Sequence, residues 1–592
     1  MNDDEQAKAA FFEALDLLDA DDLPAAEERL RGALRLAPGR PSAMANLAVV
    51  LLRQRRLGEA AEVAQTLLAV DPANVEGWLV LGLALQRQHR LVESLDALDR
   101  AISVVPANAQ LRATRGTVLV ALDRHDAAVV DFAASVDLDP DQTDVRALLV
   151  QAKMQICDWA GIDASIAEIL DRVRSSRGTL SPFILLGLPS SASDQLACAT
   201  AHCAQRFPPR QPLYAGERYT NERVRLAYVS GDFREHAMSQ LMAGVFEHHD
   251  RSRFEVLAIS TGPDDGSAIR ARVAGAFDRF IDAQGLSDED IARLIHREQV
   301  DIAVDLGGHT AGGRPLVLAM RPAPIQVNYL GYPGTSGSPC MDYLIADPVV
   351  IPAEERRNYT EAVVWMPNTY FPNDDKREIA ETTSTRVEEG LPRDGFVFAS
   401  FNNSYKISPD VFDLWMGLLR EIDSSVLWLL NSNPFVVGNL WREAASRGVA
   451  AERLVFAKKA SPAAHLARHR HADLFLDTRY YNGHTSACDA LWAGAPMVTC
   501  TGATFPSRVA TSILLASGLP ELATQSMEDY AAAALRLARL PDELARIRAT
   551  IAANRATSPL FDTGLFTTHL EAAYGTMAER HRRGQPPEAF SV

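Results

Sequence analysis

The sequence predicts an α plus α/β protein, in which an N-terminal superhelix of helical repeats is followed by two α/β lobes. Prolines recur 34 residues apart, at Pro38, Pro72, Pro106 and Pro140. From residue 224 onward, short apolar strands alternate with helices, a pattern typical of a parallel sheet, and a second such series begins near residue 396. The predicted divisions are residues 1–150 (repeats), 151–215 (a helical linker), 216–385 (the first lobe), 386–578 (the second lobe) and 579–592 (a tail).

The first quarter of the chain has the period of tetratricopeptide repeats. A 34-residue period with small residues at helix crossings and a closing proline is the signature of this repeat. Two antiparallel helices approach closely only where a side chain is nearly absent, and proline ends the second helix of each unit. The array leaves a concave groove, so we expect it to bind a protein or peptide. The small residues that share the period are Ala14, Ala48, Gly82 and Gly116, and Ala26, Ala60, Ser94 and Ala128.

Charge and composition exclude several classes of protein. The formal charge of −17 disfavours nucleic acid as a general partner, because phosphate binding needs a basic face. The first residues lack the basic and apolar regions of a signal peptide, and no apolar run is long enough to predict a membrane span. The six cysteines show no CxxC or zinc-like spacing. We therefore expect a cytoplasmic protein with reduced thiols, and disorder only in its last dozen residues.

Two tandem sets of strands and helices predict two doubly wound lobes that face each other across a crevice. This is the GT-B arrangement, although a pair of periplasmic-binding-like domains would produce the same pattern. In either fold, ligands bind at the carboxyl ends of the strands. The predicted strands are residues 225–229, 254–259 and 300–305 in the first lobe, and 396–400, 426–430, 454–456, 474–476 and 496–499 in the second.

Residues 477–489 follow a predicted strand and open a helix. Gly483 permits a tight turn, and Thr485 and Ser486 present hydroxyls and backbone amides at the helix N-terminus. Such a terminus favours phosphate through its unsatisfied N–H groups and the positive end of the helix dipole. Asp489, one turn further, is placed to accept hydrogen bonds from ribose hydroxyls. The alternative is an ordinary helix capped by Thr or Ser.

Three further side chains lie at predicted strand ends. Lys406 precedes a helix start at Pro409, where a lysine would meet a pyrophosphate and stabilise the charge on a leaving nucleotide. His236 and His309 follow strands of the first lobe, and histidine is the side chain best matched to proton transfer near neutral pH. The alternatives are a solvated surface lysine and two structural histidines.

Two other segments, one rich in glycine and one basic, are also candidates for a functional role. The glycine-rich residues 331–337, which include Gly334 and Thr335, would approach a sugar or phosphate closely, or would form only a tight connection. We interpret the basic residues 465–471 as one face of a helix rather than as a metal site, because no carboxylate pattern accompanies them. We expect no metal ion in the site.

A family resemblance runs over nearly the whole chain, in segments at residues 157–159, 228–233, 321–326, 331–337, 401–409, 482–489, 491–494 and 507–510. In these segments, and in the family's order, the chain resembles the tetratricopeptide O-GlcNAc transferases and their SPINDLY-like relatives. The resemblance implies a metal-independent, inverting GT-B transferase whose donor lies mainly in the second lobe. By it, Asn403 and Lys406 would hold uracil and pyrophosphate, and His236 would be the active-site histidine. The uridine site would be lined by Ala460, His465 and Arg468, phosphate and ribose would be bound by His484, Thr485, Ser486 and Asp489, and the sugar would neighbour His309 and Thr310.

This reading predicts transfer of GlcNAc from UDP-GlcNAc to Ser or Thr hydroxyls of proteins, with UDP-sugar and a protein acceptor as partners. One alternative keeps the fold and changes the donor to UDP-glucose or GDP-fucose, or the acceptor to a dedicated bacterial target. Another is a non-catalytic tetratricopeptide scaffold. Residues 482–485, with the Leu-Trp-Ala-Gly run of residues 491–494, look like those of the UDP-sugar members, and this favours UDP-GlcNAc.

Overall fold

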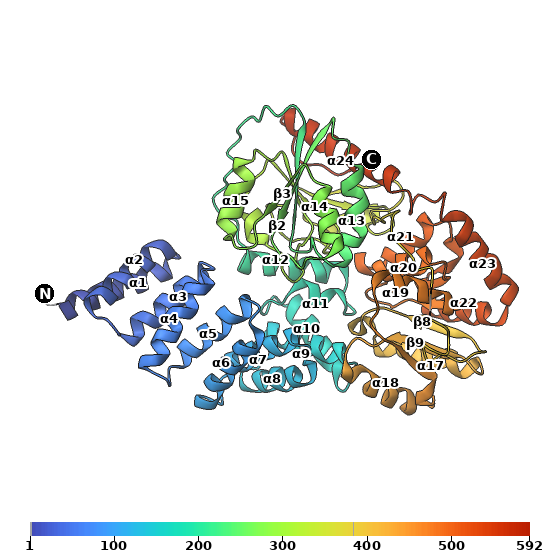
Figure 1. Ribbon diagram of the computed structural model, residues 1–592, viewed down its shortest axis with the longest axis horizontal. Coiled ribbons are helices and arrows are strands. Elements are labelled where there is room, and N and C mark those ends of the chain that lie inside the picture. The colour runs from blue at the N-terminus through green and yellow to red at the C-terminus, as the bar shows by residue number, and fades with distance from the viewer. Residues whose placement is uncertain (1–2, 383) are drawn as a thin grey trace. The chain divides into compact units, whose positions relative to one another are not determined.

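The computed structural model describes residues 3–382 and 384–592, and the chain divides into two compact units, Met1–Lys153 and Met154–Val592 (Figure 1). In the first unit, helices pair in antiparallel fashion. The predicted fold class, helical repeats followed by two parallel sheets, is confirmed. The helix pairs are α1 (Asp3–Asp19) with α2 (Leu23–Leu36), α3 (Pro41–Arg53) with α4 (Leu57–Val70), α5 (Val75–Arg87) with α6 (Leu91–Val104), and α7 (Ala109–Ala121) with α8 (His125–Leu138).

The turns and the helix crossings explain the 34-residue period. A Cβ atom on Gly116 would lie 2.5 Å from Cε1 of Phe132, and one on Gly82 would lie 2.8 Å from Cγ of Leu98, so neither helix crossing has room for a side chain. Each second helix ends at a residue in a non-helical conformation that directly precedes a period proline, because proline disfavours the α conformation in the residue before it. A residue with φ between 60° and 62° also recurs in the turn inside each pair, at Asp21, Arg55, His89 and Asp123.

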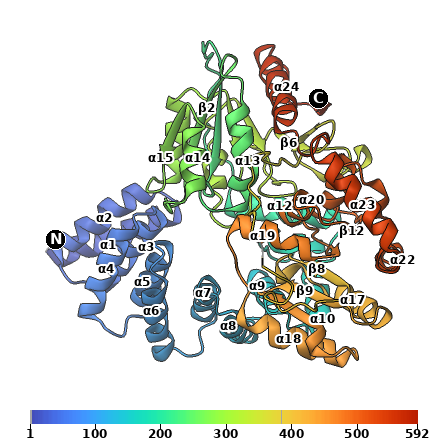
Figure 2. The ribbon, with the colours of Figure 1, turned by 45° about the vertical axis from the view of Figure 1, so that its right-hand side comes forward.

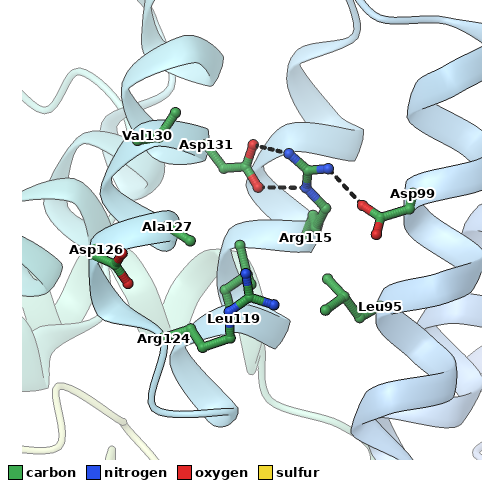
Figure 3. Close-up of a pocket in the computed structure, with 9 residues that line it drawn as sticks. All are labelled: Leu95, Asp99, Arg115, Leu119, Arg124, Asp126, Ala127, Val130 and Asp131. Carbon is green, nitrogen blue, oxygen red and sulfur yellow. Dashed lines mark hydrogen bonds and ion pairs between the residues drawn. The ribbon is translucent and has the colours of Figure 1, made fainter. Parts of the chain in front are cut away.

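An ion network replaces apolar packing in the last repeat. Arg115 occupies the repeat position that is Leu47 and Leu81 in the preceding units. Its guanidinium donates to both carboxylate oxygens of Asp131 at 2.6 and 2.7 Å, and to Asp99 at 2.6 Å (Figure 3). These side chains line a cavity of about 410 Å³ that α6, α7 and α8 enclose. The Asp131 side chain is only 1% exposed, so its charge depends on these arginine donors.

Helix α9 (Thr143–Gln155) leads from the repeats into the second unit, where it is followed by α10 (Ile162–Arg174), α11 (Pro182–Leu186) and α12 (Ala192–Arg206). The end of α9 and the segment after it pack against the second lobe. The carbonyl of Gln155 accepts hydrogen bonds from Ser404 Oγ at 2.7 Å and Asn433 Nδ2 at 2.8 Å. The ring of Trp159 packs 5.2 Å from that of Phe412. This linker therefore supports the loop after the first strand of the second sheet.

The first lobe contains a sheet with the order β14-β7-β6-β5-β4-β1-β2-β3, and all of its strands pair in parallel. Helices α13 (Ala237–His248), α14 (Ala268–Gly275) and α15 (Asp288–Arg297) lie against this sheet (Figures 1 and 2). The strands are β1 (Val224–Ser230), β2 (Phe254–Ser260), β3 (Arg279–Asp282), β4 (Ile302–Asp305), β5 (Ile325–Asn328), β6 (Tyr343–Ala346), β7 (Ala362–Trp365) and β14 (Phe590–Ser591).

The second lobe contains a parallel sheet with the order β10-β9-β8-β11-β12-β13. Helices α19 (Pro462–Arg468) and α20 (Thr485–Trp492) lie on the side of this sheet that faces the first lobe (Figures 1 and 2). The strands are β8 (Val397–Ser400), β9 (Val426–Leu430), β10 (Leu454–Ala457), β11 (Leu474–Leu476), β12 (Met497–Cys500) and β13 (Ala523–Thr524). The other helices are α17 (Pro409–Glu421), α18 (Pro434–Ser446), α21 (Val509–Ala516), α22 (Met527–Arg539) and α23 (Pro541–Asn554).

The C-terminal end of the chain returns to the first lobe. Helix α24 (Thr563–Arg582) places Glu571 2.9 Å from Nδ1 of His249, in a buried contact. The expectation of disorder in the last dozen residues is wrong for Phe590 and Ser591, which pair with β7, because a strand of only two residues is stabilised by a distant sheet edge that local sequence does not reveal. No helix among the described residues has both the length and the apolar character needed to cross a bilayer.

Candidate functional site

The predicted lysine lies directly after β8, in a short 3₁₀ turn from Ser404 to Lys406. Lys406 Nζ donates to the carbonyl of Asn482 at 2.9 Å and lies 4.0 Å from the centre of the Tyr481 ring. Burial lowers the pKa of Lys406 to about 8, and the nearby carboxylate of Asp477 opposes this shift. The alternative of a solvated surface lysine is therefore wrong for this side chain.

Asp477 holds the turn between β11 and α20. Its Oδ1 accepts hydrogen bonds from the backbone N–H of Gly483 at 2.6 Å and of Thr478 at 2.8 Å, and its Oδ2 accepts one from Thr499 Oγ1 at 2.6 Å. Burial raises the pKa of Asp477 to about 6. A Cβ atom at Gly483 would lie 2.7 Å from Oγ of Ser486 and 3.1 Å from Oδ1 of Asp477, so any other residue would displace the Ser486 hydroxyl.

The start of α20 brings the predicted phosphate-binding residues beside Lys406. His484 is the N-cap residue and makes no side-chain cap hydrogen bond, and the helix begins at Thr485. His484 Nε2 donates to the carbonyl of Pro506 at 3.1 Å. Burial, with a further contribution from the charge of Lys406, lowers the pKa of His484 well below its usual value, so the ring is neutral at pH 7. Ser486 Oγ donates to Asn402 Oδ1 at 2.6 Å.

The predicted uridine-site residues lie on and beside α19. Ala460 is exposed before the helix, and Asn403 is exposed before the 3₁₀ turn that carries Lys406. The ring of His465 lies 5.3 Å from that of Phe401, and burial lowers its pKa to about 3. Arg468 is buried and donates from Nη1 to the carbonyl of Lys458 at 2.7 Å. This surface offers a neutral imidazole and an exposed loop to a planar base.

Asp489 lies one turn into α20 and is held by a residue that the sequence did not single out. Arg377 Nη2 donates to Asp489 Oδ1 at 2.6 Å. Arg377 lies in the connection between β7 and β8, which joins the two lobes. The connection therefore supplies the side chain that holds Asp489 of the second lobe.

His236 is the N-cap residue of α13. Its Nδ1 accepts a hydrogen bond from the backbone N–H of Met238 at 3.3 Å and lies 3.7 Å from Asp232 Oδ2. Although 42% of the side chain is exposed, desolvation of the ring lowers its pKa, so the ring is neutral and the proton then lies on Nε2. In this arrangement His236 presents a hydrogen-bond donor, and it must exchange tautomers before Nε2 can accept a proton.

His309 lies in a buried aromatic cluster, with its ring 5.0 Å from Tyr332 and 5.5 Å from His202. Its Nε2 donates to the carbonyl of Ser336 at 2.7 Å, and burial lowers its pKa, so the lone pair lies on Nδ1. No residue of the described parts of the chain donates to that Nδ1 atom. Thr310 follows and bonds to the carbonyl of Gly307 at 2.7 Å.

The glycine-rich loop connects the two lobes through Tyr332. This ring packs in one apolar cluster with Leu186 and with Tyr481, the residue that faces Lys406. Thr335 Oγ1 donates to Glu361 Oε2 at 2.7 Å, and the carbonyl of Gly334 accepts from Asn328 Nδ2 at 3.1 Å. Gly334 and Thr335 therefore brace the loop.

Sequence reasoning did not assign roles to Asp477, Tyr481, Arg377 or Glu361. Asp477 had a detectable signal, because it directly follows a predicted strand in the same motif as His484. Arg377 and Glu361 act through contacts 112 and 26 positions away, which no local pattern reveals. In residues 3–382 and 384–592, no group of three His, Cys, Asp or Glu side chains is arranged to hold a metal ion.

Comparisons with known proteins give the chain its relatives. Residues 209–383 and 375–570 match the model of glycosyl transferase family 41, and residues 13–75 and 79–143 match tetratricopeptide repeats. A probable UDP-N-acetylglucosamine--peptide N-acetylglucosaminyltransferase SEC of Arabidopsis thaliana is 35% identical over 461 residues, which cover 74% of this chain and 47% of the relative. The corresponding transferase of Caenorhabditis elegans is 28% identical over 558 residues, with coverages of 73% and 48%. The chain thus spans about half the length of the curated relatives it matches.

A solved structure supports the same assignment. A mutant of the O-GlcNAc transferase of Thermobaculum terrenum superposes with a TM-score of 0.68 at 28% identity, over 92% of this chain and 98% of that one. The family match covers every strand of both sheets except β14, and the segments that carry Lys406, His484 and Asp489. The resemblance seen in the sequence is confirmed, and the chain belongs to glycosyl transferase family 41.

Proposed function

We propose that this protein transfers GlcNAc from UDP-GlcNAc to Ser or Thr hydroxyls of proteins in the cytoplasm, without a metal ion. The observation that carries the proposal is the position of Lys406. Its buried ammonium lies beside the start of α20, and its hydrogen-bond acceptor is the neutral carbonyl of Asn482. A diphosphate at this position would receive a charge-assisted hydrogen bond and the amides of a helix N-terminus. The printed names of the curated relatives support UDP-GlcNAc as donor and peptide as acceptor.

In the proposed reaction, the acceptor oxygen forms a bond to the anomeric carbon while the bond from that carbon to the diphosphate oxygen breaks. UDP leaves with the electron pair, and the hydroxyl proton passes to a base. The barrier falls mainly through alignment of the reacting atoms and stabilisation of charge on the departing diphosphate. Lys406 and the amides of Thr485 and Ser486 would supply that stabilisation. His484 is neutral and would present its Nδ1 lone pair to a donor hydroxyl.

The remaining site residues divide between nucleoside and sugar. We assign the uracil to Asn403, Ala460, His465 and Arg468. Asn403 and Ala460 are exposed, and the ring of His465 lies 5.3 Å from that of Phe401, which precedes Asn403 by two residues. Asp489 would accept from the ribose. On the first lobe, His236 would donate from Nε2 to the sugar or acceptor. His309 and Thr310, with Gly334 and Thr335, would shape the side of the site that lies next to the sugar. The repeat array would hold the protein acceptor.

The test is incubation of the protein with a cell lysate and, separately, UDP-GlcNAc, UDP-glucose and GDP-fucose, followed by intact-protein mass measurement. Addition of one N-acetylhexosamine, only with UDP-GlcNAc, is the predicted result. A hexose or a deoxyhexose would establish one of the alternative donors instead. Calorimetry with UDP tests the scaffold alternative, because a non-catalytic scaffold would give no heat of binding.

A further inference from the structure

Arg377 lies at the junction of a cavity and the nucleotide-binding helix. The cavity, of about 330 Å³, lies between the lobes and is lined by Arg377, by Gln240 and Ile269 of the first lobe, and by Pro462 and Leu466 of α19. The Arg377 side chain is only 6% exposed, although arginine is rarely buried unless its donors are satisfied.

The two terminal nitrogens of this guanidinium differ in their hydrogen bonding. Nη2 donates to Asp489 Oδ1 at 2.6 Å. Nη1 is buried and has no hydrogen-bond partner in residues 3–382 and 384–592. The backbone of Arg377 is fixed as well, because its carbonyl accepts from Trp492 Nε1 at 3.1 Å. A buried donor without a partner costs free energy in a rigid site, so an outside acceptor that satisfies it contributes to binding.

In the part of the chain that the structure describes, Asp489 has one carboxylate oxygen free to accept a hydrogen bond from the ligand that would satisfy Nη1 of Arg377. Its Oδ1 is occupied by Arg377, and within the described chain nothing donates to its Oδ2. The pair thus offers one donor and one acceptor side by side, with no net charge. The ring of His465, which feels the charges of both residues, is neutral at pH 7 because burial lowers its pKa to about 3. This neutral pair is suited to a hydroxyl, which donates and accepts at once, rather than to a phosphate.

We propose that Arg377 is a ribose-recognition residue, which holds Asp489 through Nη2 and donates from Nη1 to a hydroxyl of the ribose diol of the bound nucleotide. The proposal rests on the function proposed above and adds a residue from the connection between the lobes to the donor site. The same contact would make nucleotide binding sensitive to the placement of that connection, because Arg377 belongs to neither sheet.

The experiment measures the dissociation constants of UDP, 2′-deoxy-UDP and 3′-deoxy-UDP by calorimetry, for the unaltered protein and for Arg377→Met and Arg377→Lys. The unaltered protein should bind at least one deoxy analogue about tenfold or more weakly than UDP, the loss expected for a hydrogen bond to a charged group. Arg377→Met should bind UDP more weakly and lose most of that discrimination. Arg377→Lys keeps a cation for Asp489 but has one nitrogen in place of the guanidinium fork, so it lacks a counterpart of Nη1. It should remain folded and also lose discrimination.

Arg386→Met is the matched control, because Arg386 pairs with Asp473 at 2.9 Å in the same lobe and does not line the cavity. It should lower the melting temperature while the ratio of UDP to deoxy-UDP affinity stays unchanged. If both Arg377 variants discriminate between UDP and deoxy-UDP as well as the unaltered protein does, the inference is overturned and the proposed function stands. UDP binding by the unaltered protein without any discrimination would have the same consequence, whereas no UDP binding at all would overturn both.

Discussion

Lys406 donates to the backbone carbonyl of Asn482 over 2.9 Å, across the 76 positions that separate the loop after β8 from the turn before α20. The contact joins two strand ends of one sheet at the point where the helix N-terminus begins. A carbonyl is a weak partner for an ammonium compared with a carboxylate, so the contact leaves the lysine able to exchange it for a diphosphate oxygen.

Replacement of Lys406 by Met should abolish most transfer while the fold persists. Loss of one preorganised charge donor typically costs about 10²–10³ in kcat. The melting temperature should hardly change or should rise, because the variant removes a cation whose pKa burial already lowers. Lys459→Met is the control, since Lys459 is exposed, and it should retain full turnover. Turnover in the Lys406 variant within about threefold of the unaltered rate would contradict the assignment.

Affinity for UDP should fall as pH rises above about 8. The pKa of Lys406 is about 8 in the free protein, and a bound diphosphate raises it, so binding takes up a proton in the range between the two values. Within that range the affinity should fall by up to about tenfold per pH unit, and below pH 8 the contribution of Lys406 is fully present.

The matched variant Asp477→Asn moves that pH range. Asp477 is the carboxylate that raises the pKa of Lys406, so its removal should shift the decline in UDP affinity to lower pH. Calorimetry at several pH values distinguishes this result from a simple loss of affinity. An unchanged pH range in Asp477→Asn would show that the two groups are not linked.

Gly116→Ala should destabilise the repeat array. The added Cβ would lie 2.5 Å from the Phe132 ring, and overpacking of this kind costs about 1–3 kcal/mol. Gly58→Ala is the matched helical control, because nothing lies within 4 Å of its Cβ position, and it should stabilise the array by up to about 1 kcal/mol. Denaturant unfolding compares the two, and equal effects would contradict the packing account.

The ion network of Arg115 and Asp131 should show strong coupling. Arg115→Leu, which installs the residue found at Leu81, leaves Asp131 with Arg112 alone and should cost about 3 kcal/mol. The double change with Asp131→Ala, the residue found at Ala97, removes the stranded charge and should recover most of that loss. Additive losses in a double-mutant cycle would contradict the buried-charge account.

Much of this structure follows from local patterns in the sequence. The 34-residue period predicts the array because small residues recur at the helix crossings, where Gly82 meets Leu98 and Gly116 meets Phe132. The motifs at residues 401–409 and 477–489 meet because both follow parallel strands of one sheet, β8 and β11, which are adjacent.

The missed parts depend on distant contacts. Strands β3, β5, β6 and β7 were not predicted from the sequence, and each pairs in parallel with a strand from another part of the first lobe. Strand β14 forms because the edge of β7 accepts it from more than 200 residues away. The role of Arg377 likewise emerges only when the fold brings Asp489 to it, 112 positions along the chain.

The central claim is that Lys406 and the N-terminus of α20 hold a nucleotide diphosphate, and a crystal structure with UDP tests it most directly. The account predicts a diphosphate oxygen at about 2.7–2.9 Å from Lys406 Nζ, in place of the Asn482 carbonyl, with the amides of Thr485 and Ser486 directed at the phosphates. A structure in which UDP binds with its phosphates away from Lys406, while Lys406 still donates to Asn482, would contradict it.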